Sequence, residues 1–156
     1  MVICIDFDGT CVTHAFPKVG EGIGAEAVLK DLIDQGHRLI LFTMRSDTKH
    51  GKYLTDALDW FKSKGIELYG VNKNPTQHTW TTSPKAAADL YIDDLALGIP
   101  LTTPKGSKPH VDWSAARQLL TDAGILKETD EEQEALARLI YEFPSTQEAQ
   151  RLGLWD

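Results

Sequence analysis

The chain has 156 residues, of which 42% are hydrophobic and 25% charged, and its formal net charge is -7 at pH 7. This length corresponds to one domain that can bury a core without disulfides. No apolar run approaches the length of a membrane span. The negative charge argues against nonspecific binding to nucleic acid, although a specific nucleic-acid partner stays open. The two cysteines, Cys4 and Cys11, lack metal-ligand spacing, which favours a reduced intracellular chain. With no long apolar run and with an aspartate already at position 6, we expect a cytoplasmic protein with no membrane partner.

The first predicted element is a strand over residues 2–5. All four residues are apolar, without the polar alternation of a half-exposed strand, which predicts burial on both faces, as in a parallel sheet. Asp6 follows the strand, and Asp8 lies two positions later, so in extended chain both carboxylates point the same way while Phe7 packs inward. Gly9 then allows a sharp turn. Taken alone, this stretch also fits an ordinary Asp-Gly turn.

Helices and strands alternate in the next part of the chain. Residues 11–24 hold several glycines and a proline, which predicts a flap. Apolar spacing and glycine stops then predict a helix over 25–35, a strand over 39–42, a helix over 52–64, a strand over 66–71, a polar loop over 72–84 and a strand over 90–92. This alternation implies right-handed crossovers and an α/β fold, namely a three-layer Rossmann-like parallel sheet with helices on both faces.

The alternation of helices and strands ends near residue 102. Residues 102–110 are rich in Pro, Gly and Lys and are predicted as a linker. Helix-capping patterns follow at Asp112, at Thr129 with Glu132, and at Ser145 with Glu148.

These signals predict two regions. We expect a catalytic core over residues 1–104 and a linker with a C-terminal helical extension over residues 105–156. The helices beyond residue 110 are expected to lie outside the catalytic machinery. They would roof the site, form a subunit contact in a homo-oligomer, or pack on the outer surface of the core.

Polar residues lie at the end of each later strand. Thr43 follows the second strand, Asn72 follows the third, and the pair Asp93 and Asp94 follows the fourth, with Lys85 shortly before it. In open parallel sheets, ligands bind beyond the carboxyl ends of the strands. We therefore expect Asp6, Thr43 and Asp93 to converge at one edge.

Together these motifs resemble those of the haloacid dehalogenase superfamily of phosphotransferases. The resemblance covers residues 1–104 and rests on Asp-Phe-Asp-Gly-Thr after the first strand, Thr43 after the second, and Lys85 before the Asp93–Asp94 pair. No interval between the motifs has room for a substantial cap domain, so the chain is similar to the small capless phosphatases of the superfamily.

The resemblance implies a role for each motif residue. Asp6 is the nucleophile that forms an aspartyl-phosphate, and Asp8 protonates the leaving oxygen and then activates water. Thr43 donates to the phosphoryl oxygens, and Lys85 neutralises the transferring group. The implied cofactor is Mg²⁺, with ligands from the residues Asp6, Asp8 (through its main-chain carbonyl), Asp93 and Asp94.

Other polar residues near this edge have weaker assignments. Arg45 could hold a second anionic group of the substrate, and Asn72 is a weaker candidate of the same kind; a solvated loop arginine is the alternative for Arg45. His14, His78 and Trp80 lie in loops that border the site and receive no assigned role.

The sequence thus predicts a magnesium-dependent phosphomonoesterase that acts on a phosphorylated substrate, with a small molecule favoured. Three alternatives stay open: a phosphatase of phosphorylated macromolecules or nucleic-acid ends, a phosphotransferase with an acceptor other than water, and a noncatalytic binding protein of the same fold. The intact residues Asp6, Asp8, Thr43 and Lys85 weigh against the last of these.

Overall fold

The computed structural model describes residues 1–128 and 130–142 of the chain. These belong to two compact units, Met1–Leu126 and Lys127–Asp156. Among the described residues, no helix combines the length and the apolar character that crossing a bilayer requires.

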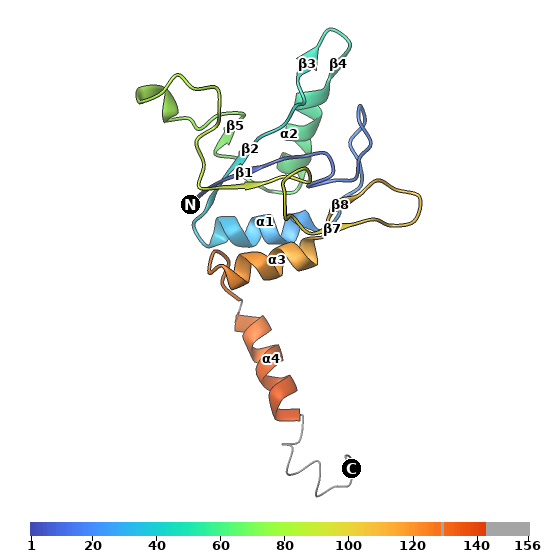
Figure 1. Cartoon of the computed structure of the whole chain (residues 1–156), viewed down its shortest axis with the longest axis vertical. Coiled ribbons are helices and arrows are strands. Elements are labelled where there is room, and N and C mark those ends of the chain that lie inside the picture. Colours follow the sequence, from blue (N-terminus) through green and yellow to red (C-terminus); the bar gives the residue numbers. More distant parts are fainter. Residues whose placement is uncertain (129, 143–156) are drawn as a thin grey trace, which may run out of the picture. The chain divides into compact units, whose positions relative to one another are not determined.

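The first unit is built on a four-stranded parallel sheet (Figure 1). Its strands lie in the order β5 (Gly70–Val71), β2 (Arg38–Leu41), β1 (Val2–Ile5) and β6 (Leu90–Ile92). The chain moves outward from β1 through β2 to β5 and then returns to the other side of β1. This Rossmann-like α/β arrangement confirms the predicted fold class.

The register of the strands brings their carboxyl ends level with one another. Ile5 of β1 lies opposite Leu41 of β2 and Ile92 of β6. The residues that follow these strands, among them Asp6 and Asp93, therefore leave the sheet at the same edge.

One face of the sheet is covered by helices. The helices α1 (Ala25–Asp34) and α2 (Tyr53–Ser63) share a buried cluster with alternate strand residues, which are Ile3, Ile5, Leu39 and Leu41. Their own apolar residues recur at helical spacing, so each helix buries a single stripe.

The opposite face is covered by the segment between β5 and β6. Val2, Cys4 and Ile40 point to this side and share a second, smaller buried cluster with Ala86. The segment was expected to be a loop over residues 72–84, and its only helix is the single 3-10 turn η1 (Gln77–Thr79). The expectation of helices on both faces is therefore met on one face only: among the described residues of this unit, the helical cover of the second face is limited to η1.

A single buried side chain organises that segment. The Gln77 carboxamide accepts hydrogen bonds from the N–H groups of Asn74 and Ala87 and donates to the carbonyls of Ser83 and Lys85. Gln77 therefore satisfies backbone groups that a regular helix would have paired internally.

Two short antiparallel hairpins were not expected. One joins β3 (Asp47–Thr48) to β4 (Gly51–Lys52) just before α2, and the other joins β7 (Leu101–Thr102) to β8 (His110–Val111). The second hairpin spans the predicted linker over residues 102–110. This segment is not a free linker, because both residues of β8 are buried.

The boundary between the compact units falls after Leu126, and not after residue 104 as expected. The helix α3 (Trp113–Asp122) buries Trp113, Ala116 and Leu120 in the main core. It lies beside α1 (Figure 1), and the Arg117 guanidinium donates to the Asp31 carboxylate of α1 at 2.7 Å. The apolar stripe of α3 requires a covering surface, and α1 supplies it.

The N-cap predicted at Asp112 is confirmed, since its carboxylate accepts from the backbone N–H of Ala115 at 3.1 Å. Within the second unit, α4 (Asp130–Glu142) confirms a further helix. The capping patterns predicted at Thr129 and at Ser145 with Glu148 lie outside the described residues.

Candidate active site

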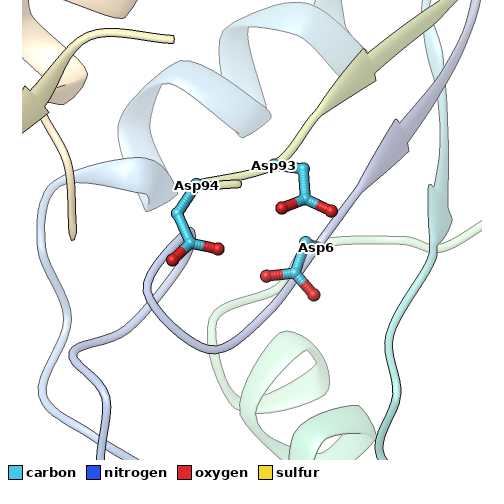
Figure 2. Close-up of side chains that lie close together, drawn as sticks. All are labelled: Asp6, Asp93 and Asp94. Atoms are coloured by element: carbon cyan, nitrogen blue, oxygen red, sulfur yellow. The ribbon is translucent and has the colours of Figure 1, made fainter. Parts of the chain in front are cut away.

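Three carboxylates meet at the carboxyl edge of the sheet. Asp6 follows β1, and Asp93 and Asp94 follow β6, so two neighbouring strands supply them (Figure 2). One oxygen of each lies within 4.8 Å of those of the other two. Sequence reasoning anticipated this convergence, and the structure brings these three predicted residues together.

Burial and negative charge both act on Asp6. The pKa of this carboxyl is raised to about 7, and burial is the largest cause. The hydrogen bonds from the Phe7 backbone and the Thr10 hydroxyl lower the pKa, and the charges of Asp93 and Asp94 raise it. Burial also raises the pKa of Asp94, while the nearby His14 opposes that shift. A cation placed among the three carboxylates would relieve this repulsion.

Thr10 forms hydrogen bonds with both Asp6 and Asp94. Its hydroxyl donates to Asp6 Oδ2 at 2.9 Å and accepts from the backbone N–H of Asp94 at 3.0 Å. Thr10 is fully buried. The sequence analysis assigned it no role, although its place as the last residue of the Asp-Phe-Asp-Gly-Thr motif was a usable indication.

His14 also contacts the cluster. Its Nε2 lies 2.9 Å from Asp94 Oδ2, so a residue of the flap touches one of the three carboxylates. The approach is possible because residue 9 is glycine: a Cβ on Gly9 would lie 2.6 Å from Asp94 Oδ2 and would also collide with the His14 ring. His78, by contrast, contacts the Pro75 carbonyl within its own loop.

Asp8 is paired with Arg45 and does not join the acidic cluster. Asp8 Oδ2 accepts from Arg45 Nε and Asp8 Oδ1 accepts from Arg45 Nη2, each at 2.7 Å. Among the described residues, the group of carboxylates that could hold a metal ion does not include that of Asp8. The resemblance assigned the Asp8 main-chain carbonyl, a different group, to the metal.

The expected role of Arg45 is not supported by its surroundings. Its side chain is only 1% exposed, and its other donors bond to the carbonyls of Pro17, Lys18 and Tyr53. All five guanidinium N–H groups are thereby used, so none is left for a second anionic group of a substrate. Arg45 instead connects Asp8 to the flap and to the start of α2.

Thr43 and Asn72 come together at the ends of β2 and β5. The Asn72 Oδ1 accepts from the Thr43 backbone N–H at 2.8 Å, and Asn72 has a positive φ of 55°. Thr43 Oγ1 accepts from the Arg45 backbone N–H at 3.1 Å, which leaves the hydroxyl proton able to donate. The Asn72 side chain therefore holds the Thr43 backbone in place.

The structure does not bring Lys85 to the carboxylates. Its ammonium lies 5.5 Å from the centre of the Tyr91 ring, and its side chain is exposed. Among the described residues it forms no ion pair with Asp6. The flexible four-carbon stem of lysine is the reason that sequence position alone does not fix where its charge lies.

Comparisons with known proteins give one informative match. No family model matches the chain, and no curated protein matches it. A solved structure of a conserved protein from Bacteroides thetaiotaomicron is 36% identical to this chain, with a TM-score of 0.62. The match covers 85% of this chain and 95% of that one.

Proposed function

We propose that this chain, which belongs to the same family as the conserved Bacteroides thetaiotaomicron protein, is a magnesium-dependent phosphomonoesterase. The observation that carries the proposal is the convergence of Asp6, Asp93 and Asp94 at the carboxyl edge of a parallel sheet. This is the edge at which such sheets bind ligands.

The donor set fits Mg²⁺. Asp6, Asp93 and Asp94 offer hard carboxylate oxygens within 4.8 Å of one another, and Mg²⁺ prefers a few carboxylates with its remaining positions taken by water or substrate phosphate. Bound there, Mg²⁺ supplies charge neutralisation that lets an anionic phosphoryl group approach a carboxylate. The raised pKa of Asp6 supports the same fit, because its causes are burial and negative neighbours.

Asp6 is the proposed nucleophile. Its carboxylate oxygen bonds to phosphorus while the ester P–O bond breaks, which gives an aspartyl-phosphate and an alcohol that takes up a proton. Water then attacks phosphorus, releases inorganic phosphate and restores the Asp6 carboxylate. The Thr10 hydroxyl fixes the rotation of that carboxylate through its hydrogen bond to Oδ2.

Asp8 is the proposed proton donor and acceptor. Each of its oxygens accepts one hydrogen bond from Arg45 and keeps a second lone pair, at which a proton can be taken up or released. Arg45 thus sets the position from which Asp8 acts. The Thr43 hydroxyl is proposed to donate to a phosphoryl oxygen, and Lys85 to turn its ammonium from the Tyr91 ring toward the phosphoryl group.

One observation favours a second candidate, a phosphatase of phosphorylated macromolecules. Met44 follows Thr43 and is 99% exposed, and Leu95 follows Asp94 and is 88% exposed. Large apolar side chains beside polar site residues suit contact with a bulky substrate. Met44→Ser and Leu95→Ser would then raise KM for a phosphorylated protein and leave KM for a small ester unchanged.

The cytoplasm is the proposed location, and the state of the two cysteines agrees with it. Cys4 and Cys11 are both free and buried. Burial raises the pKa of the Cys4 thiol to about 11 and that of Cys11 well above its ordinary value, so both stay protonated and unreactive.

The test is hydrolysis of an aryl phosphate ester by the purified chain, with Mg²⁺ and with a chelator. We expect turnover only with the metal, and none from Asp6→Asn, which removes the nucleophile but keeps the shape of the side chain. Asp59→Asn is the matched control, because Asp59 is exposed on α2. Equal rates with metal and chelator, or full activity in Asp6→Asn, would refute the proposal.

A further inference from the structure

The segment that enters α3 contacts the loop that carries the acidic cluster. The Val111 backbone N–H donates to the Gly9 carbonyl at 2.9 Å, and the indole Nε1–H of Trp113 donates to the Thr10 carbonyl at 2.7 Å. Two consecutive carbonyls of the first motif are therefore held by residues roughly a hundred positions away in the chain.

Thr10 connects the Trp113 indole to the acidic cluster through hydrogen bonds. The Thr10 backbone is fixed by the indole, and its hydroxyl contacts both the Asp6 carboxylate and the Asp94 backbone N–H. Trp113 can therefore affect the positions of Asp6 and Asp94 without contacting either carboxylate. A shift of the Thr10 backbone changes the separation between Asp6 and Asp94.

The indole is itself rigidly held. Trp113 is 4% exposed and belongs to the main core cluster. It occupies the first position of α3, directly after the capping residue Asp112. Its Cβ lies close to Gly24, the residue before α1, since a Cβ added to that glycine would be 3.6 Å from it. Burial on this scale leaves the Nε1–H with one direction in which to donate.

We propose that Trp113 is a positioning residue of the acidic cluster. Through the Thr10 carbonyl it holds Asp6 and Asp94 at the separation that a divalent cation requires. The metal part of this inference rests on the proposed function, whereas the geometric part does not. Groups that orient metal ligands from outside the coordination sphere commonly change metal affinity by ~10–100-fold when they are removed.

The test uses Trp113→Phe, which keeps an aromatic ring in the core and removes the N–H donor. Leu32→Ala is the control, because Leu32 is a fully buried residue of the same core that has no bond to the motif loop. Both variants lose packing, so the free energy of unfolding of each is measured by denaturant titration and used to correct the other readouts.

The first readout needs no metal and no activity. The Asp94 amide N–H bonds to Thr10 Oγ1, so its hydrogen exchange, measured by NMR, reports the position of Thr10. After correction for global stability, we expect exchange to be faster by about tenfold in Trp113→Phe and unchanged in Leu32→Ala. In the double variant with Thr10→Val, the Trp113 substitution should have no further effect, because the indole acts through Thr10.

The second readout is Mg²⁺ binding by calorimetry. We expect the Kd for Mg²⁺ to rise by about tenfold in Trp113→Phe and to stay unchanged in Leu32→Ala. Unchanged Asp94 exchange in a folded Trp113→Phe variant would overturn the inference. If the wild-type chain binds no Mg²⁺, the proposed function fails instead, and the exchange experiment still decides the role of Trp113.

Discussion

The Arg45 guanidinium donates one hydrogen bond to each carboxylate oxygen of Asp8, and both bonds are 2.7 Å long. Its remaining N–H groups reach the carbonyls of Pro17 and Lys18 in the flap and of Tyr53 in α2. One buried cation thus joins the proposed proton donor to two other segments. The position of Asp8 is therefore coupled to the folding of the flap.

Arg45→Lys tests this coupling. An ammonium has three donors and no planar fork, so it cannot replace five hydrogen bonds that diverge from one guanidinium. We expect the free energy of unfolding to fall by about 2 kcal/mol or more, because buried carbonyls and a carboxylate oxygen lose their donors. Arg38→Lys is the control, since Arg38 is exposed at the start of β2. Equal denaturation midpoints for the two variants would contradict the prediction.

The pKa of Asp6 predicts how stability depends on pH when no metal is present. Burial raises this pKa from 3.8 to about 7, so between these values the folded protein keeps a proton that the unfolded chain has released. The free energy of unfolding should therefore fall as the pH rises from about 4 to about 7, by up to about 4 kcal/mol from this group. Burial of Asp94 acts in the same direction.

Denaturant titrations in chelator at several pH values measure this fall. Asp6→Asn stays neutral at every pH, so the variant should lose the Asp6 contribution and be more stable than the wild type at pH 8. The exposed-site variant Asp59→Asn should follow the wild-type curve. An Asp6→Asn curve parallel to that of the wild type would rule out the raised pKa.

Mg²⁺ should stabilise the wild-type chain above pH 7, because a cation among three ionised carboxylates binds the folded state alone. At a concentration of 100 times Kd, the expected gain in the free energy of unfolding is about 2.7 kcal/mol. Asp93→Asn should reduce this gain, since it removes one of the three converging carboxylates. Melting curves with MgCl₂ and with NaCl of equal ionic strength separate binding from screening; equal shifts in both salts would argue against a metal site.

Gly9→Ala and Gly36→Ala separate backbone strain from crowding. Both glycines have positive φ, 80° and 89°, so each substitution should cost ~1–2 kcal/mol of stability from conformation alone. A Cβ at Gly36 meets open space, whereas one at Gly9 would collide with His14 and Asp94. We therefore expect Gly9→Ala to be the more destabilising of the two and to weaken Mg²⁺ binding. The same loss of stability in both variants, with Mg²⁺ binding intact, would contradict the described geometry.

Two truncations test where the first compact unit ends. A chain that stops after Lys127 keeps all of Met1–Leu126 and should unfold cooperatively and bind Mg²⁺. A chain that stops after Lys105 lacks the core residues Trp113, Leu120 and Leu126 and should not show a cooperative transition. Circular dichroism melts distinguish the two. A cooperative transition in the shorter chain would restore the boundary expected from the sequence.

The ends of β1 and β6 were predictable because each is marked by a change from apolar to acidic residues within a few positions of the sequence. An apolar run that stops at Asp6, and another that stops at Asp93, place both carboxylates at one sheet edge by topology alone. The helix stripes of α1 and α2 and the cap at Asp112 are equally local, and all were predicted.

The partners of individual side chains were not predictable in this way. The sequence places Arg45 two residues after Thr43, which suits a substrate contact; only the folded flap shows that its donors are already used. Trp113 looked like part of an appendage because its hydrogen-bond acceptor, Thr10, lies at the other end of the unit. Contacts between distant segments depend on the packed tertiary structure, which hydrophobic periodicity does not encode.

The long separation between Thr10 and Trp113 also bears on how the chain is made. The two residues are 103 positions apart, so at synthesis rates of about 5–20 residues per second some 5–20 s pass between them on the ribosome. During that interval the nascent chain carries the first motif without the indole that fixes its loop. Asp94 is synthesised only 19 residues before Trp113. Because the first unit ends at Leu126, the contact between Trp113 and Thr10 can form only when nearly the whole unit has been synthesised.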